Sequence, residues 1–92
     1  MIKKYILKKL TDLANPILGT KIISCSDEFF APAKRLINPL EPIYKDGIFD
    51  NNGKWMDGWE TRRKRSKGYD FVIIKLGKPG KINNVNIDTS FF

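Results

Sequence analysis

The segment from Lys54 to Arg65 contains the chain's densest group of side chains that can perform chemistry. Its twelve residues include two tryptophans, two carboxylates and five cations. Arginine presents a planar fork that binds carboxylate or phosphate through paired hydrogen bonds, and tryptophan excludes water from a binding site. Carboxylates orient N–H groups or transfer protons. The segment is therefore suited to one wall of a pocket for a small, anionic, hydrogen-bonding substrate.

A nucleic-acid surface is the alternative interpretation of this segment. The basic run Arg62–Arg65 would then follow phosphates, while Trp55, Trp59 and Tyr69 would stack on bases. Two carboxylates lie just upstream of the basic run and would repel a phosphate backbone. We therefore favour the small-molecule pocket and expect no nucleic-acid partner. Successive residues of an extended segment face opposite sides, so Trp55 and Trp59 are also candidates for the core.

The size and charge of the chain limit what it can do alone. It has 92 residues, a net charge of +7 and an apolar fraction of 41%, which is ordinary for a globular domain. A domain of this size buries only about 60% of its unfolded surface, so we do not expect a self-sufficient active site. The two densest groups of cations lie apart, one near the N-terminus and one at residues 62–67, so no continuous basic stripe is evident.

The numbers of cysteine and histidine residues limit the disulfides and metal sites that the chain can form. Cys25 is the single cysteine and the chain has no histidine, so neither an intramolecular disulfide nor a metal-ligand spacing is present. We interpret Cys25 as a buried, inert thiol, and we expect no metal and no cofactor. The apolar run Tyr5–Leu7 is too short for a signal peptide or a membrane span. These features predict a cytoplasmic protein with no membrane partner.

The first third of the chain predicts a helix, a strand and a helical turn. Apolar residues recur at helical spacing up to the break at Asn15-Pro16, namely Ile2, Ile6, Leu10 and Leu13. We expect this helix to pack on the domain rather than on a membrane or a partner. Residues 21–25 predict a buried strand. Ser26-Asp27 is positioned to cap a following helical turn, in which Pro32 lies near the start and residues 33–37 continue. Asp27 and Glu28 therefore lie at a strand-to-helix corner, and capping accounts for one of them.

The remainder predicts a long loop and two strands. Residues 38–53 are rich in turn residues and indicate an ordered loop or a ragged edge hairpin. Residues 70–76 and 85–89 predict two strands joined by a turn at 77–80 and paired antiparallel. About four strands are too few to close a sandwich, and the sequence finishes on two aromatic residues. We therefore expect the front part of something longer; the alternative is a small protein whose final phenylalanines fold back onto the sheet.

Residues 53–65 resemble the signature of the allantoicase family. Other segments agree in the same order along nearly the whole chain: residues 10–14 with Leu18-Gly19, then 26–33, 76–80 and 85–90. The resemblance implies a mainly β fold, a partial galactose-binding, discoidin-like jelly-roll β-sandwich, here with a short N-terminal helix. It also implies that residues 1–92 are the N-terminal portion of one such domain, the first of two repeats in a homo-oligomer.

The reaction implied by the resemblance is hydrolysis of allantoate to ureidoglycolate and urea. Allantoate carries one carboxylate and two ureido groups, which suits the predicted pocket. We assign Asp57 and Glu60 as the catalytic carboxylates. The substrate-binding residues that we predict are Lys54, Trp59, Arg62, Arg63, Asp27 and Glu28, with either arginine holding the substrate carboxylate. The alternative function is a non-catalytic jelly-roll ligand-binding module, because fold alone does not fix function.

Overall fold

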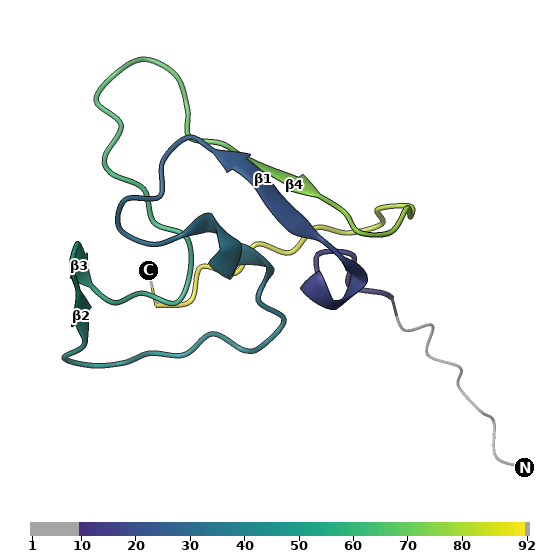
Figure 1. Ribbon diagram of the computed structural model, residues 1–92, viewed down its shortest axis with the longest axis horizontal. Helices are drawn as coiled ribbons and strands as arrows, with labels where there is room; N and C mark the ends of the chain where they lie inside the picture. Colours follow the sequence, from purple (N-terminus) through teal and green to yellow (C-terminus); the bar gives the residue numbers. More distant parts are fainter. Residues whose placement is uncertain (1–9, 92) are drawn as a thin grey trace, which may run out of the picture.

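A two-stranded antiparallel sheet is the centre of the fold. The computed structural model describes residues 10–91. β1 (Lys21–Cys25) pairs with β4 (Val72–Lys75), although the two strands lie far apart in the sequence (Figure 1). Both strands are rich in β-branched residues, which favour extended backbone. The strand expected at 21–25 is therefore confirmed, and the strand expected at 70–76 is confirmed over residues 72–75.

The partner of β4 differs from the sequence-based expectation. Residues 85–89 were predicted to form the neighbouring strand, but the structure has no strand there, and β4 pairs with β1 instead. Val85 and Ile87 are 71% and 78% exposed, so their alternating pattern has no surface to pack against. Alternation identifies the two faces of a strand but not its partner, which is why the prediction was wrong.

The N-terminal helix prediction is wrong where it can be checked. Residues 10–15 are not helical; residues 1–9, which carry the rest of the predicted helix, lie outside the described part of the chain. Asp12 Oδ1 accepts a hydrogen bond from the Ala14 amide at 3.1 Å, and Asn15 Oδ1 accepts one from the Ile17 amide at 3.0 Å. Such local bonds compete with helical hydrogen bonds. A short 3-10 helix, η1 (Pro16–Leu18), follows, and Gly19 ends it at φ 94°.

The helical turn predicted after Ser26-Asp27 is confirmed in its later part, as the 3-10 helix η2 (Ala33–Ile37), which begins after Pro32. Its cap was predicted incorrectly. The Glu28 carboxylate, rather than Ser26-Asp27, accepts a hydrogen bond from the Ala33 amide at 2.9 Å. The Ser26 hydroxyl bonds to Asp70 instead, and the Asp27 carboxylate binds Arg62, so neither side chain is available to the free amides of η2.

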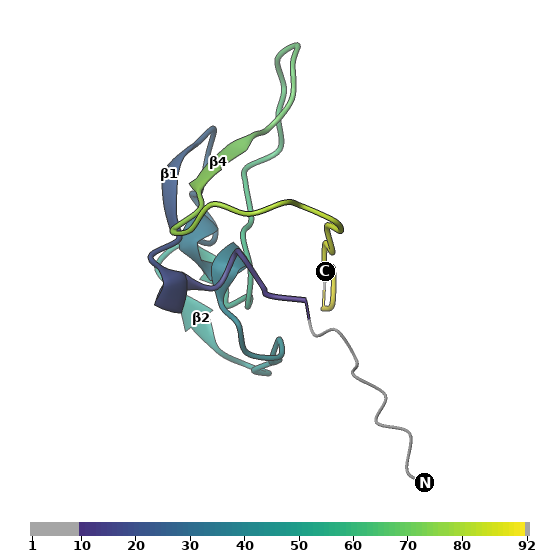
Figure 2. The same cartoon turned by 90° about the vertical axis from the view of Figure 1, so that its right-hand side faces the viewer.

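Residues 38–53 form the expected loop and ragged hairpin. β2 (Phe49–Asp50) and β3 (Gly53–Lys54) make a two-residue ladder, and the remainder of this segment is loop or turn. The segment between β3 and β4 then extends as a long loop beyond the central sheet (Figures 1 and 2). This loop contains the basic run at residues 62–65.

The buried core is small. Its apolar members in the described residues are Ala31, Ala33 and Ile37, which are 1%, 0% and 8% exposed. β1, predicted as a buried strand, is exposed or half-buried along its length because η2 covers only one face of the sheet. Thr20 is the buried polar residue, at 4% exposure. Within residues 10–91, no helical segment has the length and apolarity needed to cross a bilayer.

Trp55 and Trp59 are half-buried rather than members of that core. The Trp55 ring is contacted by two cations: the Arg35 guanidinium carbon lies 5.2 Å and the Lys45 ammonium 4.6 Å from its centroid. Arg35 also donates a hydrogen bond to the Met56 carbonyl oxygen. These contacts attach the segment after β3 to η2, so Trp55 has a structural role outside the core.

Candidate functional site

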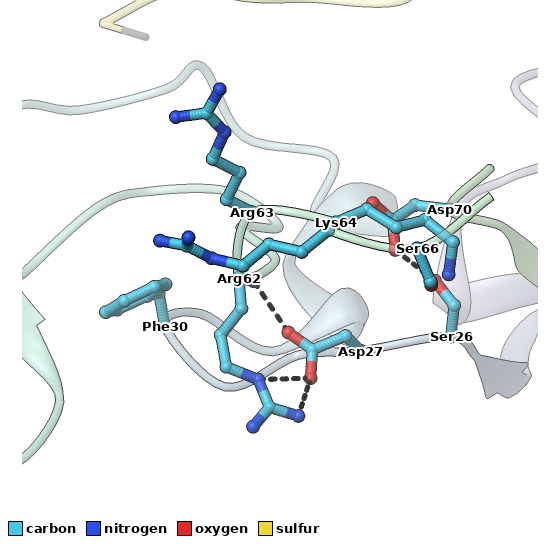
Figure 3. Close-up of a pocket in the computed structure, with 9 residues that line it drawn as sticks. Ser26, Asp27, Phe30, Arg62, Arg63, Lys64, Ser66 and Asp70 are labelled. Atoms are coloured by element: carbon cyan, nitrogen blue, oxygen red, sulfur yellow. Dashed lines mark hydrogen bonds and ion pairs between the residues drawn. The ribbon is translucent and has the colours of Figure 1, made fainter. Parts of the chain in front are cut away.

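An open hollow of about 600 Å³ lies between the end of β1 and the long loop before β4. Figure 3 shows the side chains that surround it. A volume of this size is within the range of small-molecule sites. Its lining combines basic, acidic, hydroxyl and aromatic groups: Ser26, Asp27, Phe30, Arg62, Arg63, Lys64, Arg65, Ser66 and Asp70.

Asp27 fixes one wall of the hollow by binding Arg62. Arg62 Nε and Nη2 donate to Asp27 Oδ1 at 3.0 and 2.7 Å, and the Arg62 amide donates to Oδ2 at 2.7 Å (Figure 3). The Asp27 carbonyl oxygen also accepts a hydrogen bond from Trp59 Nε1 at 2.6 Å. The bonds from the Arg62 side chain and amide hold the pKa of Asp27 below its usual value. The carboxylate therefore anchors the start of the basic run to the end of β1.

A second set of hydrogen bonds ties the loop to the sheet. Ser26 Oγ donates to Asp70 Oδ1 at 2.7 Å, and the Phe71 amide donates to Ser26 Oγ at 3.0 Å. The Ser26 amide in turn donates to the Phe71 carbonyl oxygen at 2.9 Å. Thr61 Oγ1 donates to Asp70 Oδ2 at 3.3 Å. Both ends of the loop that carries the cations are therefore held at the same corner of the sheet.

The remaining cations of the run form no ion pair within the described residues, although the Asp70 carboxylate lines the same hollow. Within residues 10–91, the ion pair that forms is Arg62 with Asp27, whereas Arg63, Lys64 and Arg65 have no such partner. Figure 3 shows the Arg63 guanidinium directed away from Asp27, on the opposite side of the loop from that of Arg62. Three exposed cations beside a hollow create a positive potential that favours a small anion.

The structure brings three of the predicted site residues together and leaves the others outside the hollow. Asp27, Arg62 and Arg63 line it. Asp57, predicted to be catalytic, does not; its Oδ2 accepts a hydrogen bond from the Ile43 amide at 2.8 Å, which orders the loop before β2.

Glu60 and Glu28 also lie outside the lining. Glu60 makes a backbone bridge with Ala31, in which each amide donates to the other residue's carbonyl oxygen at 3.2 Å. The Glu28 side chain is used to cap η2. The Glu60 side chain is half-buried, so the bridge positions this carboxylate next to the core rather than in the hollow.

Lys54 and Trp59 have structural partners. Lys54 Nζ donates to the Tyr44 hydroxyl at 2.9 Å and lies 5.0 Å from the centroid of the same ring. The contact with Tyr44 raises the pKa of Lys54. Trp59 donates its indole N–H to the Asp27 carbonyl oxygen, so it supports the Asp27 wall from behind.

Sequence reasoning did not assign six residues of the lining as site residues: Ser26, Phe30, Lys64, Arg65, Ser66 and Asp70. Lys64 and Arg65 belong to the basic run, and that run was itself a signal. Asp70 lies in the loop just before β4, and loops carry binding residues more often than the strands they connect. Nothing in the sequence pattern indicates Phe30.

Cys25 is half-buried and reduced. Burial, followed by the nearby Glu28 carboxylate, raises the pKa of its thiol. A raised pKa leaves the thiol protonated at neutral pH, which does not suit a nucleophile. The described part of the chain has no group of three His, Cys, Asp or Glu side chains arranged to hold a metal ion.

Comparison with known proteins identifies the family. The family model of the allantoicase repeat matches residues 11–92. This chain belongs to the allantoicase family. The resemblance drawn from residues 53–65 and the other collinear segments is thereby confirmed.

Allantoicase relatives are similar over most of this chain. A protein named "Probable allantoicase" from Pseudomonas fluorescens strain SBW25 is 59% identical over 85 residues, which cover 92% of this chain and 26% of the relative. One from Pseudomonas aeruginosa strain LESB58 is 56% identical over 81 residues, covering 88% of this chain and 24% of the relative. The chain thus spans about a quarter of the length of these curated relatives.

Solved allantoicase structures share the fold. The crystal structure of the Saccharomyces cerevisiae allantoicase matches with a TM-score of 0.59 at 46% identity, over 73% of this chain and 18% of that one. A second allantoicase structure matches with a TM-score of 0.59 at 45% identity over 72% of this chain and 18% of that one. The expected mainly β fold class is therefore confirmed.

Proposed function

We propose that this chain supplies the basic wall of the substrate site in an allantoicase that hydrolyses allantoate to ureidoglycolate and urea. Membership of the allantoicase family supports the reaction. The observation that carries the proposal is the cluster of Arg63, Lys64 and Arg65 beside the open hollow, without an ion-pair partner in the described residues. An anionic substrate with hydrogen-bonding ureido groups supplies the missing negative charge.

Arg63 is the residue that holds the substrate carboxylate in this proposal. Its guanidinium is not engaged by Asp27, whereas Arg62 already spends two of its donors there. Asp27 thus occupies the Nε–Nη2 edge of Arg62 and offsets its charge, whereas Arg63 forms no ion pair within the described residues. The Arg62–Asp27 pair instead fixes the position of the loop that carries Arg63. Asp70, which accepts a hydrogen bond from Ser26, is positioned to accept a ureido N–H.

The catalytic step adds water across a C–N bond of allantoate. The hydroxyl of water bonds to the carbon, the C–N bond breaks, and one proton passes to the departing urea nitrogen. Asp57 and Glu60 are the proposed base and acid of this exchange. Neither lines the hollow formed by this chain, so the complete site requires additional polypeptide that brings the substrate within their reach.

The whole-protein proposals follow from the same family. Residues 1–92 would form the N-terminal portion of one β-sandwich domain in a homo-oligomeric enzyme, and the enzyme would work in the cytoplasm, where a lone cysteine such as Cys25 stays reduced. Residues outside the matched segment of the relatives would then provide the remaining walls of the site.

The decisive experiment uses a chimera in which this chain replaces the 85 matched residues of the P. fluorescens relative. Urea release from allantoate is measured with a coupled urease assay, and allantoate binding is measured by calorimetry. The 92-residue chain is assayed in parallel. We expect urea release from the chimera. Binding without urea release would favour the non-catalytic ligand-binding module. Absence of both allantoate binding and urea release would refute the proposal.

Arg63→Gln tests the assignment of the anion ligand. Loss of a charge-assisted, paired hydrogen bond should raise KM at least about tenfold. Lys78→Gln removes one positive charge from an exposed turn outside the lining and is the matched control. Equal effects of the two substitutions would show that Arg63 acts only through general charge. An effect on kcat alone would assign it to another role.

A further inference from the structure

One face of the β1–β4 sheet is covered and the other is exposed. Ile22 pairs with Ile74, and Cys25 pairs with Val72; all four side chains are half-buried. Directly paired residues share a face, so these four form the covered face, which lies toward η2. The opposite face has no cover among the described residues.

The exposed face is apolar at its centre. Ile73 pairs with Ser24 across the sheet, and the register is irregular between Ile22 and Ser24. The irregularity is a bulge that places two residues of β1, Ile23 and Ser24, opposite one residue of β4. Ile23 and Ile73 are 53% and 52% exposed, and Phe71, two residues before Ile73, is 43% exposed. The bulge therefore adds an apolar side chain to a face that water already reaches.

Two lysines stand at one end of this face. Lys21 and Lys75 are direct partners in the ladder, and both are exposed. Like charges placed opposite each other destabilise a strand pair. A carboxylate brought between them would relieve that repulsion. The face thus has the character of half an interface, with an apolar centre and a cationic end.

We propose that this face, made of Phe71, Ile73, Ile23, Lys21 and Lys75, docks against the part of an allantoicase chain that lies outside the matched segment. The matched segment covers 26% of the P. fluorescens relative, so about three quarters of that relative is available to cover it. The surface that fits is an apolar stripe that ends in a carboxylate over the lysine pair. This inference rests on the exposed face and the family, and is independent of the catalytic proposal.

Stability of the same chimera tests the docking. Ile73→Lys should lower the Tm of the chimera by about 5 °C or more, because a charge would be buried without a partner. Ile17→Lys is the matched control: Ile17 is 85% exposed and lies in η1, outside the face. It should leave the Tm within about 1 °C. The double substitution Lys21→Glu and Lys75→Glu keeps the like-charge repulsion within the ladder but repels the predicted carboxylate, so it should also lower the Tm.

In the isolated chain, Ile73→Lys is not expected to destabilise the fold. There, Ile73→Lys should reduce the binding of a hydrophobic dye without altering far-UV circular dichroism, because the face is open to water. A chimera that tolerates Ile73→Lys as well as Ile17→Lys would overturn the proposal. So would a chimera that fails to unfold cooperatively while the unaltered relative does. Light scattering that shows a dimer of the isolated chain, abolished by Ile73→Lys, would assign the face to a second copy instead.

Discussion

The hydroxyl of Thr20 is expected to join two neighbouring segments of the chain to a third that is remote in the sequence. Thr20 is 4% exposed. Its Oγ1 donates to the Leu13 carbonyl oxygen at 2.6 Å and accepts from the Gly77 amide at 2.9 Å. Thr20→Val keeps the shape of the side chain and removes both hydrogen bonds. The substitution should therefore detach the residues before η1 and the end of β4 from the start of β1.

The magnitude follows from which groups are left without a partner. An unsatisfied buried polar group costs about 1–3 kcal/mol. Gly77 is exposed and Leu13 is half-buried, so the Gly77 amide regains water and the Leu13 carbonyl regains it only in part. We expect the free energy of local opening around the Gly77 amide to fall by about 1–2 kcal/mol. This corresponds to about 5- to 30-fold faster hydrogen exchange at that amide.

Hydrogen exchange followed by NMR at the Gly77 amide measures this effect locally, without requiring cooperative unfolding of the whole chain. Thr20→Ser retains the hydroxyl and should restore most of the protection. Thr61→Val is the matched control, because Thr61 makes only a 3.3 Å bond to Asp70, and it should leave the Gly77 amide unchanged. Equal exchange at Gly77 in wild type and Thr20→Val would refute the reasoning.

Three further predictions concern backbone space, pH and the cysteine. Gly77→Ala places a Cβ 2.0 Å from a backbone carbonyl oxygen and should cost about 3 kcal/mol in unfolding free energy, whereas Gly47→Ala meets open space at φ +69° and should cost about 1 kcal/mol; urea titration compares the two. Folding lowers the pKa of Asp27 from 3.8, chiefly through its hydrogen bonds with Arg62. The ionised Asp27 carboxylate therefore stabilises the folded chain fully above pH 3.8, and this contribution to the free energy of unfolding is lost as the pH falls through the lower pKa of the folded state. Acid titration followed by tryptophan fluorescence should show this transition, and Asp27→Asn should abolish it. The raised pKa of Cys25 should make its alkylation at pH 8 slower than in urea, and Glu28→Gln should accelerate it; equal rates in the folded and urea-unfolded chain would contradict this.

The sequence predicted local structure well where one segment decides its own conformation. The β-branched run at 21–25 and the turn-rich stretch at 38–53 have the conformation expected from their residues, and the strand expected at 70–76 forms over residues 72–75. The N-terminal helix failed within residues 10–15 because Asp12 and Asn15 bond the local backbone. The spacing of apolar residues contains no information on such hydrogen bonds between side chains and the backbone.

The chemical character of the candidate site was predicted from the sequence, but most of the residues that line it were not. The basic run and Asp27 were recognised from residue type, and both line the hollow. Trp59 and Glu28 carry equally suggestive side chains, yet one donates to a backbone carbonyl and the other caps η2. Residue type states what a side chain can bind, whereas the nearest available partner decides what it does bind.

The sequence by itself determined the family, the mainly β class and the chemistry of the basic segment, because these depend on which residues occur and in what order. Tertiary structure decided that β1 pairs with β4, that Asp27 secures Arg62 while Arg63 stays free of it, and that one face of the sheet is left open. Those outcomes depend on which segments meet after the chain turns back on itself. Contacts across 35 or more residues, such as that between Asp27 and Arg62, leave no periodic trace in the sequence.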